Sequence, residues 1–336
     1  MTAVFQVGFA GPFVSVQDAG RPGYMRYGVP ASGPMDRAAF QVLRHALDQD
    51  EGFTALEVSV GGLALTCSEG SVTAGVVGGE FTVLRDGTPQ PAWSVFTLEA
   101  GQSLTIRSGP SGSWCYLGFA GQIESQSWLG SQAMHLTSGL CGRPLTAGDM
   151  LRVTDPRVRR DLHAALPTPE FFRFSGRVRA VSGPQNHLFP SDVLAAFSRE
   201  PFGITQDYDR MGMRLTGPKL HPRDALSIPS EALVRGSVQV PGHGDPLVLL
   251  ADHQTTGGYA KIATVITADQ DRLAQARSGD QVRFDPVSVD EAIVATRKER
   301  DRLDAYIAAI PDWRGSVGDR LLRVNLISGV IAESPD

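Results

Sequence analysis

The sequence predicts an all-β class of fold, rich in strands with a few helices. Short apolar segments alternate with turns through most of the chain, which has 37 Gly and 22 Pro among 336 residues. Frequent turns between short strands are typical of sandwiches and barrels. Aromatic residues make up only 7% of the chain, so we expect an aliphatic core. The length predicts about two domains.

Residues 1–155 are expected to form the first β domain. A first strand is predicted at residues 4–10. A signal peptide is not expected there, because a signal peptide needs Lys or Arg before its apolar run and none precedes this one. Apolar residues at helical spacing then predict a helix from Met35 to Leu47, with Ser32 or Asp36 as its cap. Seven further strands are predicted between glycine-containing turns, at residues 55–60, 63–67, 71–77, 81–85, 94–98, 103–108 and 114–120.

Residues 156–172 carry a basic run and Pro167-Thr168-Pro169, which indicates a connection. Residues 173–288 are expected to form a second β domain, with helices at 191–197 and 269–276 and strands at 237–240, 247–250 and 262–267. Residues 289–336 are expected to hold a final helix at 289–310 and a tail with room for a strand at 321–330. The residues expected on the buried side of this helix are Ile293, Leu303, Tyr306, Ile307 and Ile310.

Composition excludes several classes of function. The 31 basic and 36 acidic residues give a net charge of −5, which disfavours a nucleic-acid partner. Cys67, Cys115 and Cys141 are far apart and form no CxxC pair, so we expect neither disulfides nor a zinc site, and a reducing cytoplasm. The sequence has no phosphate-binding loop, serine elbow or HExxH motif, and no apolar run long enough to span a membrane. No metal is therefore predicted within this chain.

Two segments combine acidic residues, arginines and glycines. The first covers residues 15–36, where these groups precede a helix whose N-terminus can hold an anion. Its structural alternative is an irregular loop in which Asp36 caps the helix and Asp18 pairs with Arg21. The second covers residues 207–218, where Asp and Arg recur at the same spacing around Arg210. Its alternative is a turn with surface ion pairs, which contribute little stability.

A third segment, residues 249–262, places a polar loop between two apolar strands. Gly257-Gly258 allows backbone N–H groups to approach a ligand. A plain hairpin turn needs only the two glycines, so five polar groups remain unexplained by the turn. We therefore interpret this loop as functional. The five groups are Asp252, Gln254, Thr255, Thr256 and Lys261.

These segments resemble the biotin-dependent carboxyltransferase family typified by the C-type component of 5-oxoprolinase, which also includes the KipA regulator and allophanate-hydrolase-type proteins. The resemblance extends over about residues 5–295. The stretches that carry it are Val16-Gln17-Asp18-x-Gly20-Arg21, Gly28-Val29-Pro30-x-Ser32-Gly33-x-Met35-Asp36, Ala55-Leu56-Glu57, Asp209-Arg210-Met211-Gly212, Gly236-Ser237-Val238-Gln239-Val240-Pro241 and Ala251-Asp252-His253-Gln254-Thr255-Thr256-Gly257-Gly258-Tyr259.

The resemblance implies two barrel-like domains of cyclophilin-like type, and two cytoplasmic partners: a KipI-like (B-type) protein and a lactam-utilisation (A-type) protein. It implies ATP-dependent opening of the lactam of 5-oxo-L-proline to L-glutamate, with ATP bound by this chain or by its partner. Two alternatives are a KipA-like regulatory binding role and a carboxyltransferase that uses carboxybiotin and a urea-like amide. Any biotin arrives on another polypeptide, because the chain has no Ala-Met-Lys-Met attachment sequence.

Catalytic roles are predicted for Asp252 as the acid or base, Lys261 as a stabiliser of negative charge, and Gln254. Relatives can carry Arg in place of Lys261, and a guanidinium forms no Schiff base, so covalent catalysis by Lys261 is not expected. The residues predicted to bind substrate are Gln17, Asp18, Arg21, Ser32, Asp36, Arg210, Gln239, Thr255, Thr256, Gly257, Gly258 and Tyr259.

Overall fold

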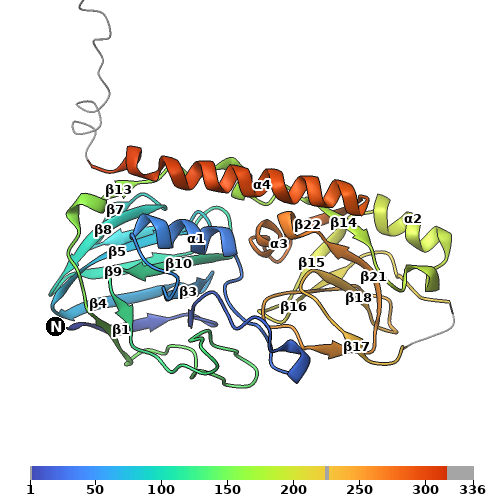
Figure 1. Ribbon diagram of the computed structural model, residues 1–336, viewed down its shortest axis with the longest axis horizontal. Coiled ribbons are helices and arrows are strands. Elements are labelled where there is room, and N and C mark those ends of the chain that lie inside the picture. Colours follow the sequence, from blue (N-terminus) through green and yellow to red (C-terminus); the bar gives the residue numbers. More distant parts are fainter. Residues whose placement is uncertain (1, 224–226, 316–336) are drawn as a thin grey trace, which may run out of the picture.

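The computed structural model describes residues 2–223 and 227–315 and shows two β domains with a long helix across them (Figure 1). The strand predicted at 321–330 lies outside the described residues. None of the described helices is long and apolar enough to cross a membrane. The β-rich class with a few helices is confirmed.

The first domain consists of two facing sheets with an aliphatic core between them. One sheet has the order β11-β12-β1-β4-β9-β6-β7 and the other the order β13-β8-β5-β10-β3-β2. The strands are β1 (Thr2–Ala10), β2 (Ser15–Gln17), β3 (Ala55–Ser59), β4 (Leu63–Glu69), β5 (Ser71–Val77), β6 (Thr82–Arg85), β7 (Thr88–Gln90), β8 (Ser94–Glu99), β9 (Ser103–Arg107), β10 (Trp114–Phe119), β11 (Gln122–Ile123), β12 (Met150–Thr154) and β13 (Ala164–Ala165).

Helix α1 (Arg37–Ala46) packs on β5 and β10 of the second sheet. Asp36 caps it, since a side-chain oxygen of Asp36 accepts a 2.8 Å hydrogen bond from the Ala39 N–H. Of the two caps considered, Asp36 is therefore the observed one. The helix comes close to the sheet at Gly118, where a Cβ atom would lie 3.1 Å from Leu43 Cδ2 of the helix.

The second domain is a closed barrel of order β14-β21-β18-β19-β16-β15-β22. The barrel form is thus observed here, while the first domain is a pair of open sheets. The strands are β14 (Arg177–Ser182), β15 (Phe202–Tyr208), β16 (Gly212–Thr216), β18 (Ser237–Val240), β19 (Leu247–Leu249), β21 (Ala260–Val265) and β22 (Gln281–Pro286). A separate two-stranded ribbon pairs β17 (Glu231–Ala232) with β20 (Thr256–Gly257). Helices α2 (Ser191–Arg199) and α3 (Thr267–Ala274) complete the domain.

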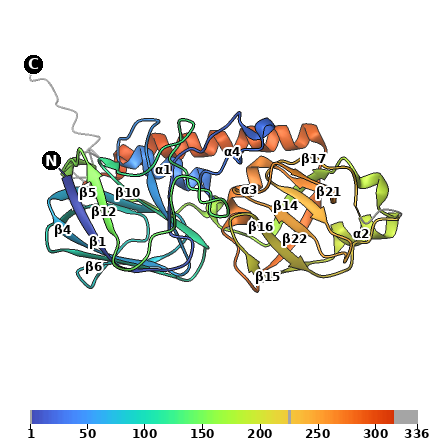
Figure 2. The ribbon, with the colours of Figure 1, turned by 90° about the horizontal axis from the view of Figure 1, so that it is seen from below.

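Helix α4 (Val289–Ala309) lies across both domains (Figures 1 and 2). It begins with a capping box between Ser288 and Glu291, and its C-terminal half buries Leu303 and Tyr306 against the first domain. Ile293 was expected on the buried side, but it is 45% exposed. This expectation was wrong because the buried side chains lie mainly toward the C-terminal end of the helix. The predicted connection at 156–172 contains β13, which pairs with β8.

Candidate functional site

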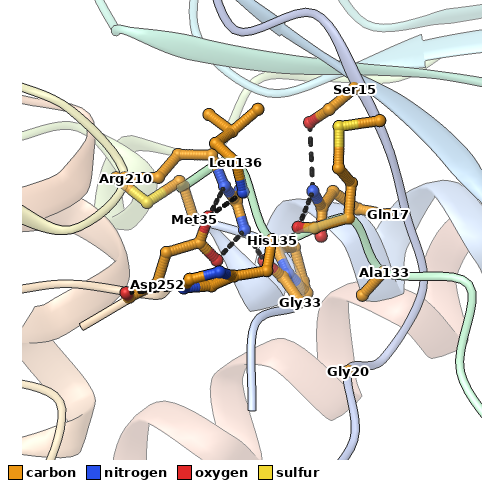
Figure 3. Close-up of polar contacts among 12 residues, drawn as sticks. Ser15, Gln17, Gly20, Gly33, Met35, Ala133, His135, Leu136, Arg210 and Asp252 are labelled. Carbon is orange, nitrogen blue, oxygen red and sulfur yellow. Dashed lines mark hydrogen bonds and ion pairs between the residues drawn. The ribbon is translucent and has the colours of Figure 1, made fainter. Parts of the chain in front are cut away.

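Arg210 joins the two domains. It lies in the turn between β15 and β16 and is 1% exposed. Its Nε and Nη2 atoms each donate a 2.9 Å hydrogen bond to the carboxylate of Asp252, and Nη2 donates at 2.7 Å to the Gly33 carbonyl (Figure 3). Its Nη1 atom pairs with Glu57 of β3. One guanidinium therefore connects the predicted loop at Asp252 with two segments of the first domain.

Glu57 is a site residue to which the sequence reasoning gave no role. Its Oε2 atom accepts 2.7 Å hydrogen bonds from the Met35 N–H and from the Tyr116 hydroxyl. That hydroxyl in turn accepts from the Asp36 N–H at 2.8 Å. Burial, and then Glu57, raise the pKa of Tyr116 well above its ordinary value, so the phenol stays protonated. A carboxylate within the apolar run of β3 was the available signal, since a buried acid requires a partner.

Asp252 is fully buried and its carboxylate is occupied by Arg210. Its Oδ2 atom also accepts from the Leu136 N–H at 3.3 Å, and its backbone carbonyl lies 3.2 Å from His135 Nε2. His135 Nδ1 faces Ser138, whose N–H donates to it at 3.2 Å and whose hydroxyl lies 2.7 Å from it. The structure thus gives Asp252 a fixed ion-pair partner, and its acid or base role stays a prediction.

Gln239 and Lys261 form a second cluster on the outer wall of the barrel. They are direct partners in the pairing of β18 with β21, so their side chains lie on the same face. Their neighbours Val238 and Ile262 point into the barrel core, which places Gln239 and Lys261 outside it. Both are nevertheless buried, at 0% and 4% exposure. The Lys261 ammonium donates to Glu231 of the β17–β20 ribbon at 2.8 Å.

The side-chain amide of Gln239 has no hydrogen-bond partner for either Nε2 or Oε1 among the described residues. Burying such an amide without partners is unfavourable, with a free-energy cost of roughly 1–7 kcal/mol that depends on the reference state. The ribbon comes close at Gly257, where a Cβ atom would lie 2.9 Å from Gln239 Nε2. This close approach explains the glycine at position 257.

The remaining residues of the third segment lie nearer the surface. Gln254 is half-buried and lines a cleft of about 390 Å³ together with Asp209 and Met211. Thr255 and Gly258 are half-buried, while Thr256 and Tyr259 are exposed. The cleft shows that the second and third segments of the sequence meet in space.

The first segment is only partly as expected. Asp18 does not pair with Arg21; it accepts from the Gly20 N–H at 2.8 Å, the Ser131 hydroxyl at 2.7 Å and the Gln132 N–H at 2.6 Å. Gln17 is buried and donates to the Ser15 hydroxyl at 3.0 Å (Figure 3). Arg21 contacts the Ala133 carbonyl, and the backbone of Ser32 lies beside Gly20. Asp18 therefore fixes the position of the loop at 131–132.

Asp36 lines a cavity of about 410 Å³ whose lining includes neither Gln239 nor Lys261. Gln275 donates to its carboxylate at 2.7 Å. Burial, followed by the nearby Asp271, raises the pKa of Asp36 from 3.8 to about 7. The structure thus supports the capping alternative for Asp36, and substrate binding by Asp36 stays a prediction.

The Asp36 titration predicts a pH-dependent stability. Because the folded chain binds this proton more tightly than the unfolded chain, the stabilising contribution is complete below about pH 4 and is lost as the pH rises to about 7. Relative to Asp36→Asn, the wild-type chain should lose up to about 4 kcal/mol across this range. Urea unfolding of both chains between pH 4 and 8 measures the slope. The same dependence of the free energy of unfolding on pH in both chains would contradict the raised pKa of Asp36.

The fold and the site together describe one class of protein. It has two β domains joined by a buried ion-pair network, with polar clusters at their junction and on a barrel wall. No group of three His, Cys, Asp or Glu side chains in residues 2–223 and 227–315 is placed to hold a metal. The chain belongs to the family described as carboxyltransferase domain, subdomain A and B, whose model matches residues 27–286.

Similarity to individual proteins supports membership in this family. The chain is 33% identical to the C component of the 5-oxoprolinase of Haemophilus influenzae over 293 residues, which cover 86% of this chain and 93% of that protein. It is 28% identical to a putative urea carboxylase of Emericella nidulans, of which it covers 26%. The crystal structure of TTHA0988 matches with a TM-score of 0.75 and 34% identity, covering 84% of this chain and 55% of that one.

Proposed function

We propose that this chain is the C-type component of an ATP-dependent 5-oxoprolinase that opens the lactam of 5-oxo-L-proline to L-glutamate. It would act in the cytoplasm with a KipI-like (B-type) partner and a lactam-utilisation (A-type) partner, and ATP would bind to this chain or to its partner. The 33% identity over 93% of a 5-oxoprolinase C component supports this proposal.

The unpartnered amide of Gln239 is the observation that carries the proposal. A five-membered lactam holds its N–H and C=O on the same edge. A glutamine carboxamide offers the complementary edge, with Nε2–H as the donor and Oε1 as the acceptor. One bound lactam would therefore satisfy both atoms of Gln239 at once, and its entry requires the β17–β20 ribbon to move away from the amide, because Gln239 is fully buried beneath Gly257. Urea-like amides share this edge.

Lys261 lies next to Gln239 and supplies positive charge there. Negative charge develops on a lactam oxygen when its carbonyl carbon is attacked, and a fixed cation stabilises that charge. The carboxylate of Glu231, which pairs with Lys261, is 46% exposed, so this ion pair extends from the barrel wall to solvent. In this proposal Asp252 is a positioning residue that holds Arg210, and the 252–257 loop carries Gly257 against the amide.

Gly257 allows a test of the geometry at this position. In Gly257→Ala the added methyl group would meet Gln239 Nε2 and Leu233 Cδ1 at 2.9 Å, closer than packed atoms approach. Displacement of Gln239 is expected to lower kcat/KM for 5-oxoproline by about tenfold, equivalent to about 1.4 kcal/mol. Gly52→Ala is the matched control, because among the described residues no atom outside Gly52 and its two chain neighbours lies within 4 Å of a Cβ at this position. Equal activity of the two variants would argue against the role of Gly257.

Reconstitution tests the proposed function. The purified chain is combined with its A-type and B-type partners, and ATP cleavage that depends on 5-oxoproline is measured. The proposal predicts turnover only when all three proteins are present. Assembly of the complex without turnover on 5-oxoproline would overturn it and would leave the KipA-like regulatory role.

A carboxyltransferase that uses carboxybiotin and a urea-like amide is the second candidate. The family description and the likeness to a putative urea carboxylase favour it. In that case a biotin carrier on another polypeptide would be required, and avidin would block turnover. Turnover of 5-oxoproline that is insensitive to avidin would favour the 5-oxoprolinase.

A further inference from the structure

Arg21 is a buried guanidinium without a carboxylate partner among the described residues. Of the arginines described, only Arg21 and Arg210 are buried, each at 1% exposure. Arg210 pairs with two carboxylates. The Nη2 atom of Arg21 contacts the Ala133 carbonyl and, at 3.2 Å, Cys141 Sγ. Its Nε and Nη1 atoms have no partner in the described part of the chain. An isolated buried charge is strongly unfavourable, so an anion bound beside Arg21 would stabilise the guanidinium.

Two more polar atoms without a partner in residues 2–223 and 227–315 lie on the same loops, Gln17 Oε1 and Ser32 Oγ. Gln17 donates to the Met134 carbonyl at 3.1 Å, adjacent in sequence to the carbonyl that Arg21 contacts. The Arg21 N–H donates to the carbonyl of residue 31 at 2.8 Å, adjacent to Ser32. The three side chains therefore come from the end of β2, from the turn that follows it and from the segment at residue 32. Backbone and side-chain hydrogen bonds connect β2 and its turn to residues 133–134 and the turn to residue 31.

The unpartnered atoms specify the chemistry of a ligand. Two guanidinium nitrogens and a hydroxyl can donate to the oxygens of an anion, whereas Gln17 Oε1 can only accept. An anion without a proton, such as acetate or nitrate, would leave Gln17 Oε1 unpaired. Hydrogencarbonate and hydrogenphosphate carry an O–H group, from which this oxygen can accept a hydrogen bond.

We propose that Arg21, Gln17 and Ser32 bind a small oxyanion that carries its own proton, at a site distinct from the lactam position at Gln239. The site is closed in this structure, since Arg21 is 1% exposed, so binding requires the covering loop to move at residues 133–142 while Asp18 holds residues 131–132. This loop has little regular structure and contains the isolated bridge between His135 and Leu140.

Thermal unfolding of the full chain at pH 8 tests this site. Hydrogencarbonate, phosphate, acetate and nitrate are titrated at constant ionic strength. We expect a saturable rise in Tm with hydrogencarbonate or phosphate, at concentrations at least tenfold below any effect of acetate or nitrate. Comparison of the first two salts identifies which of them is the ligand. Equal responses to all four salts would overturn the proposal.

Two variants and a control assign the response to the site. Arg21→Met should abolish the rise in Tm and, without added anion, should unfold at or above the wild-type Tm. Arg177→Met should keep the full response, because Arg177 is an exposed partner of Asp285. Ser32→Ala removes a hydroxyl that has no partner among the described residues, so the chain should fold normally and bind the anion at least threefold more weakly. A wild-type response in Ser32→Ala and Arg21→Met would refute the site, whatever the outcome of the 5-oxoprolinase assay.

Discussion

Arg210→Met is expected to lower the free energy of unfolding by about 3–5 kcal/mol, because it leaves two fully buried carboxylates, those of Asp252 and Glu57, without a counter-charge. Burial lowers the pKa of Arg210, but Asp252 and Glu57 outweigh this effect and hold it above its ordinary value. The guanidinium therefore stays charged over the accessible pH range. Urea unfolding measures the loss.

The matched control for Arg210 is Arg177→Met. The guanidinium of Arg177 is 60% exposed and pairs with Asp285 at the surface, so its loss should change the free energy of unfolding by no more than about 1 kcal/mol. A loss for Arg210→Met as small as this control would show that the junction between the domains does not depend on the buried ion pairs.

Gln239→Leu is expected to lower kcat/KM for 5-oxoproline by about 100-fold in the reconstituted complex. Two hydrogen bonds to the lactam edge would be lost, at roughly 1.5 kcal/mol each. Its free energy of unfolding should stay within about 1 kcal/mol of wild type or rise, because the variant removes two polar atoms that have no partner among the described residues of the free chain. Loss of activity without loss of stability is the signature of a binding residue.

The control for Gln239 is Gln6→Leu, which makes the same chemical change at an exposed position of β1. It should leave kcat/KM unchanged. If Gln239→Leu were as active as Gln6→Leu, the amide would have no part in substrate recognition. The same would follow if its free energy of unfolding fell as far as that of Arg210→Met.

Local patterns predicted the elements that have clear boundaries. The strands at Ser71–Val77 and Ser237–Val240 occur as expected, because apolar residues end at glycine or proline turns there. Strands β14 and β22 were missed, since alternating arginines and other polar residues weaken their apolar pattern. Helix α3 begins at Thr267, two residues before its predicted start.

The candidate site could be predicted only in part, because its contacts join distant parts of the chain. The pair of Arg210 with Glu57 spans 153 residues, and no local spacing indicates it. The proximity of Gln239 to Lys261 depends on the register of β18 with β21. Conversely, the short spacing of Asp18 and Arg21 suggested a pair that does not form, because Asp18 holds the loop at 131–132 instead.

A structure of the assembled complex with 5-oxoproline bound would show whether Gln239 binds the lactam. We expect the lactam N–H and C=O to lie within about 3.2 Å of Gln239 Oε1 and Nε2, beneath the β17–β20 ribbon and beside Lys261. A lactam bound elsewhere, with the amide of Gln239 still unpartnered, would contradict it.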